Sequence, residues 1–302
     1  APGLPDRRRR THLVPLLRGA SPSIVIALVT DSNALVPPDL RARFAVDVVP
    51  LTVVVDGAPY AEGVDLTTPA FYERLAAGAD VSTAAPAPGA LLRAYEQAAA
   101  RGAEAVLSIH IGSNTSATVG SARVAAASSP IPVEIVDTGT ASFPVACCVW
   151  AAGRVLEHGG DLDEAAAAAQ EVSRVVGNVF VVGALDLARR GGRLASGAED
   201  GGGVPVLALR DGTMDVLGRA ADIETAVEAM VAEFARASAG ELMRVGVGEA
   251  SAPEVAGELA RRLGAQPETA ELVRYEVGPS VAAHSGLGTA GAVYFPARLA
   301  GP

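Results

Sequence analysis

Short apolar runs that alternate with Ala-rich segments constrain the fold of this chain more than any other feature. In the first half, strand-forming runs lie at 24–29, 103–109 and 133–136, and helix-forming segments lie at 88–101, before 127 and at 141–157. Continuous runs of Val, Ile and Leu are typical of strands buried on both faces, and this alternation indicates a mainly parallel sheet. The sequence therefore predicts a mainly parallel, Rossmann-like α/β domain over residues 23–160.

The pattern changes after Gly159-Gly160, where strands and helices mix less regularly. Strands are expected at 178–182, 204–209, 214–216, 242–247 and 270–277, with helices at 163–175, 223–237 and 252–263. This mixture indicates an α+β domain, which we place at 161–302. Residues 1–22 are rich in Arg and Pro and are expected to be a disordered leader.

Composition and charge exclude some classes of function. The net charge of −10 argues against a general nucleic-acid binder, which would present a basic face. No apolar run approaches the roughly 20 residues needed to span a membrane, so we expect no stable membrane insertion. Two cysteines among 302 residues suggest a reducing compartment, and we expect the protein in the cytoplasm.

Three clusters of small polar residues fall at strand ends or in loops. They are Thr30-Asp31-Ser32, Ser82-Thr83, and Ser113 with Ser116. In an open α/β sheet, ligands bind beyond the carboxyl ends of the strands, where hydroxyls suit an anion such as a carboxylate. Ser and Thr also cap helices, so capping is the competing interpretation of each cluster.

Two further segments are candidates for ligand contact. His284 lies in a loop bracketed by Gly278 and Gly288, where glycines allow the backbone to approach a ligand closely. The run Arg189-Arg-Gly-Gly-Arg193 would either neutralise an anion or end a helix, with Gly191 as the C-cap.

A partial dinucleotide fingerprint, Gly246-Val-Gly248-Glu-Ala-Ser251, is expected between a strand and a helix. It has Ser251 where the fingerprint has Gly or Ala, so it is weak evidence for a nucleotide. The sequence contains no metal-ligand spacing, P-loop or Gly-x-Ser-x-Gly elbow. We therefore expect no cofactor, no metal and no catalytic residues.

Six segments, taken in order, resemble the DegV family of fatty-acid-binding proteins over residues 24 to 295. Each is a weak match alone, and the order makes the set specific. The segments are Val29-Thr-Asp-Ser32, Val49-Pro-Leu51, Thr83-Ala-Ala-Pro-Ala-Pro-Gly89, Ser113-Asn-Thr-Ser116-Ala-Thr118 with Ser121-Ala122, Arg189-Arg-Gly-Gly-Arg193, and Gly278-Pro-Ser-Val-Ala-Ala-His284-Ser-Gly-Leu-Gly288.

The resemblance implies a long-chain fatty acid held between the two domains. Its carboxylate would be bound by Thr83, by the serine loop at Ser113 and Ser116, and by His284. The matched motifs add Asp31, Ser32 and Arg193 as candidate ligand-binding residues. Such carriers present the bound acid to a separate fatty acid kinase, so the resemblance implies a non-catalytic protein.

The sequence departs from the family pattern in places. Ala84 and Ala85 replace Ser and Gln after Thr83, and Thr115-Ser-Ala-Thr118 replaces Leu-Ser-Gly-Thr. Residues 195–203, with four glycines and two acids, replace an apolar helix that covers the acyl tunnel. We expect these residues to be exposed and mobile and the tunnel to be more open.

Two enzymatic alternatives remain at this stage. A serine hydrolase acting on an acyl ester would use Ser116 or Ser113 as nucleophile, His284 as base and an acid such as Asp31. A nucleotide-dependent oxidoreductase would rest on the Gly246 segment alone. Turnover of an ester would support the first, and absence of bound nicotinamide would dispose of the second.

Overall fold

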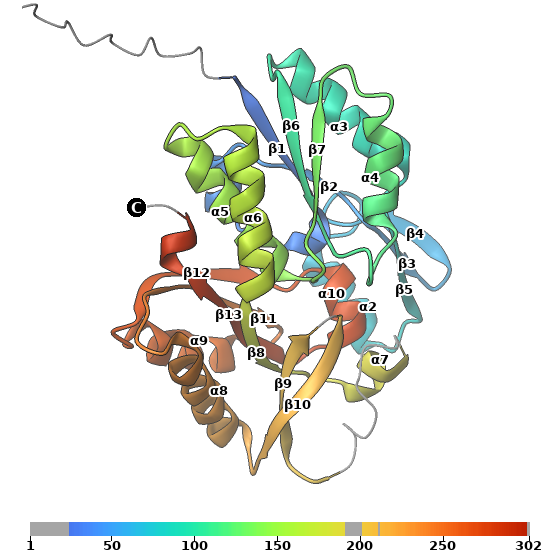
Figure 1. Cartoon of the computed structure of the whole chain (residues 1–302). Helices are drawn as coiled ribbons and strands as arrows, with labels where there is room; N and C mark the ends of the chain where they lie inside the picture. The colour runs from blue at the N-terminus through green and yellow to red at the C-terminus, as the bar shows by residue number, and fades with distance from the viewer. Residues whose placement is uncertain (1–23, 191–200, 211, 301–302) are drawn as a thin grey trace, which may run out of the picture.

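The computed structural model describes residues 24–190, 201–210 and 212–300 (Figure 1). The leader expected at residues 1–22 therefore lies outside the described residues.

The first sheet is fully parallel, with strand order β2-β1-β6-β7. Leu28 and Val29 in β1, like Val106 and Leu107 in β6, point to opposite faces and are all buried. Helices α3 and α4 cover one face, and α5 and α6 cover the other (Figure 1). The bounds are β1 Ile26–Asp31, β2 Asp47–Val49, β6 Ala105–His110, β7 Val133–Asp137, α3 Pro88–Ala100, α4 Thr118–Ala126, α5 Phe143–Glu157 and α6 Leu162–Val175.

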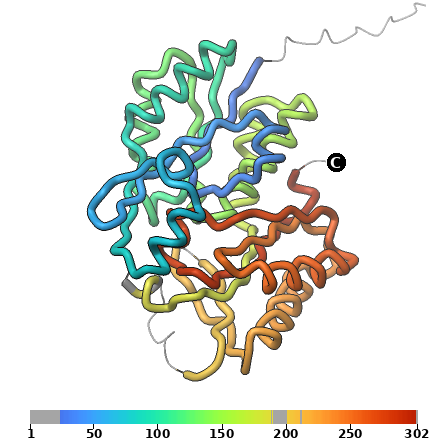
Figure 2. The backbone as a smooth tube through the Cα atoms, turned by 180° about the vertical axis from the view of Figure 1, so that it is seen from behind, coloured from blue at the N-terminus to red at the C-terminus, as the bar shows by residue number. Residues whose placement is uncertain are grey.

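A small antiparallel sheet, β4-β3-β5, is inserted after β2. Pro50 separates β2 from β3, and Asp56-Gly57 turns the chain with positive φ at both residues. This sheet packs against α10 near the other end of the chain, and Figure 2 shows that juxtaposition from behind. The bounds are β3 Thr52–Val55, β4 Ala58–Ala61, β5 Val81–Ala84, α2 Thr68–Ala76 and α10 Pro279–Ser285.

The second large sheet is mixed, with strand order β10-β9-β8-β13-β11-β12. Only β11 and β12 pair in parallel within it, and α8 and α9 pack on one face. The structure thus confirms the predicted fold class, a parallel α/β part followed by an α+β part. The bounds are β8 Gly177–Val181, β9 Val204–Arg210, β10 Thr213–Ala220, β11 Met243–Ala250, β12 Thr269–Glu276, β13 Thr289–Pro296, α8 Ile223–Ser238 and α9 Pro253–Gly264.

Helix α5 joins the two large sheets into one core. Its residues from Phe143 to Gly153 are all buried, which matches their apolar sequence. The ring of Trp150 meets Phe295 of β13 edge-on, with 5.7 Å between ring centroids. Helix α6 follows residue 160 and packs on α5, so it shares this core.

The two glycines of the partial dinucleotide fingerprint lie inside β11, not in a loop after a strand. The rings of Phe143 and Tyr275 stack with centroids 4.0 Å apart. A Cβ at Gly246 would overlap the Phe143 ring, and one at Gly248 would overlap the Tyr275 ring. Aromatic packing therefore explains these glycines without a nucleotide.

We predict that Gly246→Ala lowers the free energy of unfolding by about 1–3 kcal/mol, because the added methyl overpacks a filled core. Gly120→Ala is the matched control, since a Cβ there meets nothing within 4 Å in the exposed face of α4. That change should stabilise the protein by about 0.5–1 kcal/mol. Urea unfolding measures both, and equal stability of the two variants would contradict the packing explanation.

Candidate functional site

A cavity of about 750 Å³ lies where the small sheet, the carboxyl edge of the parallel sheet and the mixed sheet meet. Its wall is largely apolar, with Leu51, Ile111, Phe180 and Met214 among the contributors. The described lining residues include no Lys or Arg, and Asp80 is their only acidic side chain. This volume and apolar character are typical of small-molecule sites.

Thr83 and His284, 201 residues apart in sequence, are hydrogen-bonded across this cavity. Thr83 Oγ1 lies 3.2 Å from His284 Nε2. Thr83 is paired with the buried Val53, so its side chain is on the face of the small sheet that α10 covers. His284 is not in a loop, as the sequence suggested, but in α10, which starts with Pro279 and stops at Gly286 with a positive φ.

The two candidate ligand-binding residues of the serine loop, Ser113 and Ser116, differ in their positions relative to the cavity. Ser116 lines the cavity, and its Oγ lies 2.8 Å from Thr118 Oγ1 at the start of α4. Ser113 is exposed and is not among the lining residues. Its backbone N–H donates to Asp137 Oδ1 at 3.0 Å, and bonds from Ser113 help to lower the pKa of Asp137, although partial burial acts in the opposite direction. The structure therefore brings Thr83, His284 and Ser116 to one cavity, and leaves Ser113 outside it.

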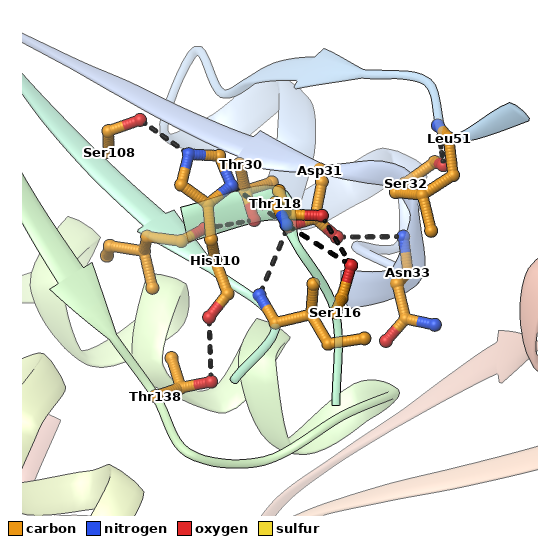
Figure 3. Close-up of polar contacts among 12 residues, drawn as sticks. Thr30, Asp31, Ser32, Asn33, Leu51, Ser108, His110, Ser116, Thr118 and Thr138 are labelled. Atoms are coloured by element: carbon orange, nitrogen blue, oxygen red, sulfur yellow. Dashed lines mark hydrogen bonds and ion pairs between the residues drawn. The ribbon is translucent and has the colours of Figure 1, made fainter. Parts of the chain in front are cut away.

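Asp31 is fully buried and does not line the cavity. Its carboxylate accepts hydrogen bonds from the N–H groups of Asn33 and Ile111, each at 3.1 Å, and from Nδ1 of His110 at 2.9 Å (Figure 3). Asn33 and Ile111 both line the cavity, so Asp31 positions two residues of the wall without lining the cavity itself. The prediction that Asp31 contacts ligand directly does not fit this geometry, because protein donors surround its carboxylate.

The hydrolase alternative offered Asp31 as one acid that could orient His284, and Asp31 is bonded to His110 instead. A chain continues from His110 Nε2 to Ser108 Oγ at 2.7 Å and to the Tyr95 hydroxyl at 2.8 Å. The side chains of this hydrogen-bonded series are all fully buried, and none of them lines the cavity. The series therefore offers no nucleophile to a ligand in the cavity. The sequence held one overlooked signal, since Ser108 and His110 are two apart in a strand and share a face.

Ser32 is also placed behind the cavity rather than in its wall. Its hydroxyl is bonded to the Glu62 carboxyl group and accepts the N–H of Leu51 at 2.8 Å. Glu62 in turn accepts the N–H of Ser280 at the start of α10, at 2.6 Å. Burial raises the pKa of the Glu62 carboxyl, which the hydrogen bonds from Ser280 and Ser32 only partly oppose. Ser32 therefore helps to hold α10 against the small sheet.

Two of the predicted features, Arg193 and the Gly-rich segment 195–203, fall at the edge of the described residues. Arg193 and residues 195–200 lie outside the described residues, and Gly201–Gly203 are exposed before β9. Helix α7, Leu185–Arg190, includes the first two arginines of the basic run, and Arg189 pairs with Asp186 at 3.0 Å. Gly191, the expected C-cap, lies outside the described residues.

The polar residues of the wall that were not predicted from sequence include Asn178, Ser285 and Thr289. The Asn178 side chain donates to Leu209 O at 3.0 Å and accepts from Leu209 N at 2.6 Å. It thereby replaces backbone pairing where β8 and β9 separate, beyond their one paired position at Phe180 and Leu207. An Asn within a Val-rich strand was the available signal.

Within residues 24–190, 201–210 and 212–300, no helix is long and apolar enough to cross a membrane. The same residues contain no cluster of three or more His, Cys, Asp or Glu side chains arranged to hold a metal ion.

We predict that Glu62→Gln becomes increasingly more stable than the wild type as pH rises above about 4.5. Because the pKa of Glu62 is raised on folding, its favourable contribution is complete below the unfolded pKa and is lost as pH rises through the folded pKa. The difference in unfolding free energy between the variant and the wild type is expected to change by at most about 1.4 kcal/mol per pH unit. Thermal unfolding from pH 4 to pH 8 measures it, with the exposed Glu96→Gln as control; parallel pH profiles for wild type and Glu62→Gln would refute it.

Comparisons with known proteins agree on one relationship. A model of the family described as uncharacterised protein, DegV family, matches residues 25–297. A DegV domain-containing protein of Streptomyces coelicolor is 33% identical over 273 residues, covering 89% of this chain and 97% of the relative. One from Deinococcus radiodurans is 31% identical over 283 residues, covering 90% and 98%.

Solved structures give the same result. A DegV family protein from Thermus thermophilus, described by its fatty acid binding, matches with a TM-score of 0.83 and 32% identity over 90% of this chain and all of that chain. DegV of Bacillus subtilis, described as a fatty acid binding protein, matches with a TM-score of 0.80 and 26% identity, covering 90% and 99%. In sequence and in fold, this chain belongs to the DegV family.

Proposed function

We propose that this protein binds one long-chain fatty acid in the 750 Å³ cavity, holds it by its carboxylate and does not turn it over. The observation that carries this proposal is the contact between Thr83 and His284, a polar pair at the wall of a largely apolar cavity. The fatty acid binding described for the Thermus and Bacillus structures supports it.

The head group would be held by neutral donors and an imidazole. A carboxylate that leaves water must find hydrogen-bond partners, and each bond to a charged group contributes about 1.5–3 kcal/mol. Thr83, Ser116 and His284 are the candidates that line the cavity. Ser113, which is directed to Asp137, is not part of the proposed head-group site.

The acyl chain would supply most of the binding energy. Burial of each methylene contributes about 0.8 kcal/mol, so a long chain offsets the cost of taking the carboxylate out of water. The apolar wall from Leu51 and Ile111 to Phe180 and Met214 suits that chain.

The carrier role extends to a separate fatty acid kinase, to which the bound acid would be presented. The resemblance of six ordered segments motivates this partner, and the sequence contains no P-loop of its own. Formation of acyl-phosphate from ATP only when a kinase is added would support the assignment. Formation by this protein alone would contradict it.

We predict that protein purified from a bacterial host carries fatty acid at up to one molecule per chain. Denaturation followed by mass spectrometry of the released small molecules measures this. If no acyl species is released and added fatty acid shows no saturable binding, the carrier function is wrong.

We predict that Thr83→Ala and His284→Ala each weaken fatty-acid binding by roughly tenfold or more, since about 1.4 kcal/mol corresponds to one decade. Neither change should unfold the protein, because each removes a group at the cavity rather than core volume. Ser116→Ala should weaken binding in the same direction, and Ser113→Ala, in the same loop, is the control with less than about twofold effect. Equal effects of the two serine changes in a titration would contradict the assignment of Ser116.

A further inference from the structure

Ser285 is a buried hydroxyl in the wall of the cavity whose Oγ has no hydrogen-bond partner among the described residues. Only 2% of the residue is exposed. A buried polar atom without a partner is unfavourable in the free protein, and native structures seldom retain one without a reason. Because Ser285 is also one of the residues that line the cavity, its unpaired hydroxyl points to a polar atom on a ligand, which it would reach by rotation of the side chain.

Neighbouring polar groups are engaged elsewhere and do not satisfy Ser285. The Ser285 carbonyl accepts from Ala184 N at 3.2 Å and from Thr289 Oγ1 at 3.0 Å. Thr289 Oγ1 also contacts Gly286 O at 2.8 Å and accepts from Gly183 N at 3.4 Å. A serine in a helix commonly bonds back to the carbonyl four residues earlier, and no such bond is made here.

We propose that Ser285 donates a hydrogen bond to the carboxylate of the bound fatty acid, beside Thr83, Ser116 and His284. This inference rests on the proposed function and names a further group at the same site. Ser285 follows His284 directly at the end of α10, so both side chains are presented to the cavity by one rigid helical turn. A carboxylate has about four acceptor positions, enough for all four groups.

The variants Ser285→Thr and Ser285→Val form the matched pair, because their side chains have the same shape and differ in the hydroxyl. Ser285→Thr should bind oleate within about threefold of wild type, and Ser285→Val should bind it at least tenfold more weakly than Ser285→Thr. For oleyl alcohol the difference should be smaller, because hydrogen bonds to a charged acceptor are the stronger ones. Isothermal titration with delipidated protein measures all four affinities.

Thermal unfolding of the delipidated protein is a second test. Loss of the Ser285 hydroxyl should lower the affinity for oleate but should not lower the unfolding temperature. Ser285→Ala should unfold at the same temperature as wild type or higher, because it removes an unpaired buried hydroxyl. A purely structural serine would give a lower unfolding temperature and unchanged oleate affinity, which would overturn the inference.

The two levels of the proposal fail in different ways. If wild-type protein does not bind oleate, the proposed function fails. If wild type binds oleate and the valine and threonine variants bind it equally, only the role of Ser285 fails. Equal losses for oleate and oleyl alcohol would overturn the assignment to the carboxylate.

Discussion

The position of the cavity wall depends on the hydrogen bonds made by the buried side chain of Asp31. A buried carboxyl group is tolerated only when it is hydrogen-bonded, and Asp31 is bonded to two backbone N–H groups and to the His110 imidazole. These bonds fix the carboxyl ends of β1 and β6 relative to each other. Thr138 adds a bond to His110 O at 2.8 Å, which ties the end of β7 to the same place (Figure 3). The edge of the parallel sheet is thus rigid where the cavity opens beyond it.

Helix α10 brings the second half of the chain to this edge. Glu62 holds its first turn through Ser280 N, and Asn33 Nδ2 lies 3.4 Å from Ser280 Oγ. The apolar side of α10 packs on the small sheet, in a cluster that includes Val53, Phe71 and Ala282. Segments that are more than 200 residues apart are therefore held together by the buried contact between Ser280 and Glu62 and by apolar packing. This arrangement places His284 next to Thr83.

Local patterns in the sequence predicted much of the fold, because strands buried on both faces and Ala-rich helices carry strong signals. The central strand β13 was missed, since Thr289-Ala-Gly-Ala is a weak start for a strand and its pairing with β8 and β11 is long-range. His284 was assigned to a loop because the glycines around it signal turns, whereas Pro279 starts a short helix there. Motif order brought Thr83, Ser116 and His284 into one hypothesis. The burial of Asp31 and the outward position of Ser113 depend on tertiary packing that no short motif encodes.

The chemistry of the wall suits the proposed carrier, which would have to release the acid that it binds. Charge-assisted pairing with an arginine is bidentate and strong, whereas hydroxyls and an imidazole hold a carboxylate with weaker, separable bonds. The described lining residues offer the second kind of partner, and the Asp31 carboxyl group is bonded to protein groups outside the cavity lining. Affinity would then come mainly from the acyl chain, through burial that requires no particular orientation. The polar groups would add selectivity for the carboxyl end and would hold that end in a defined position, as the proposed presentation to a kinase requires.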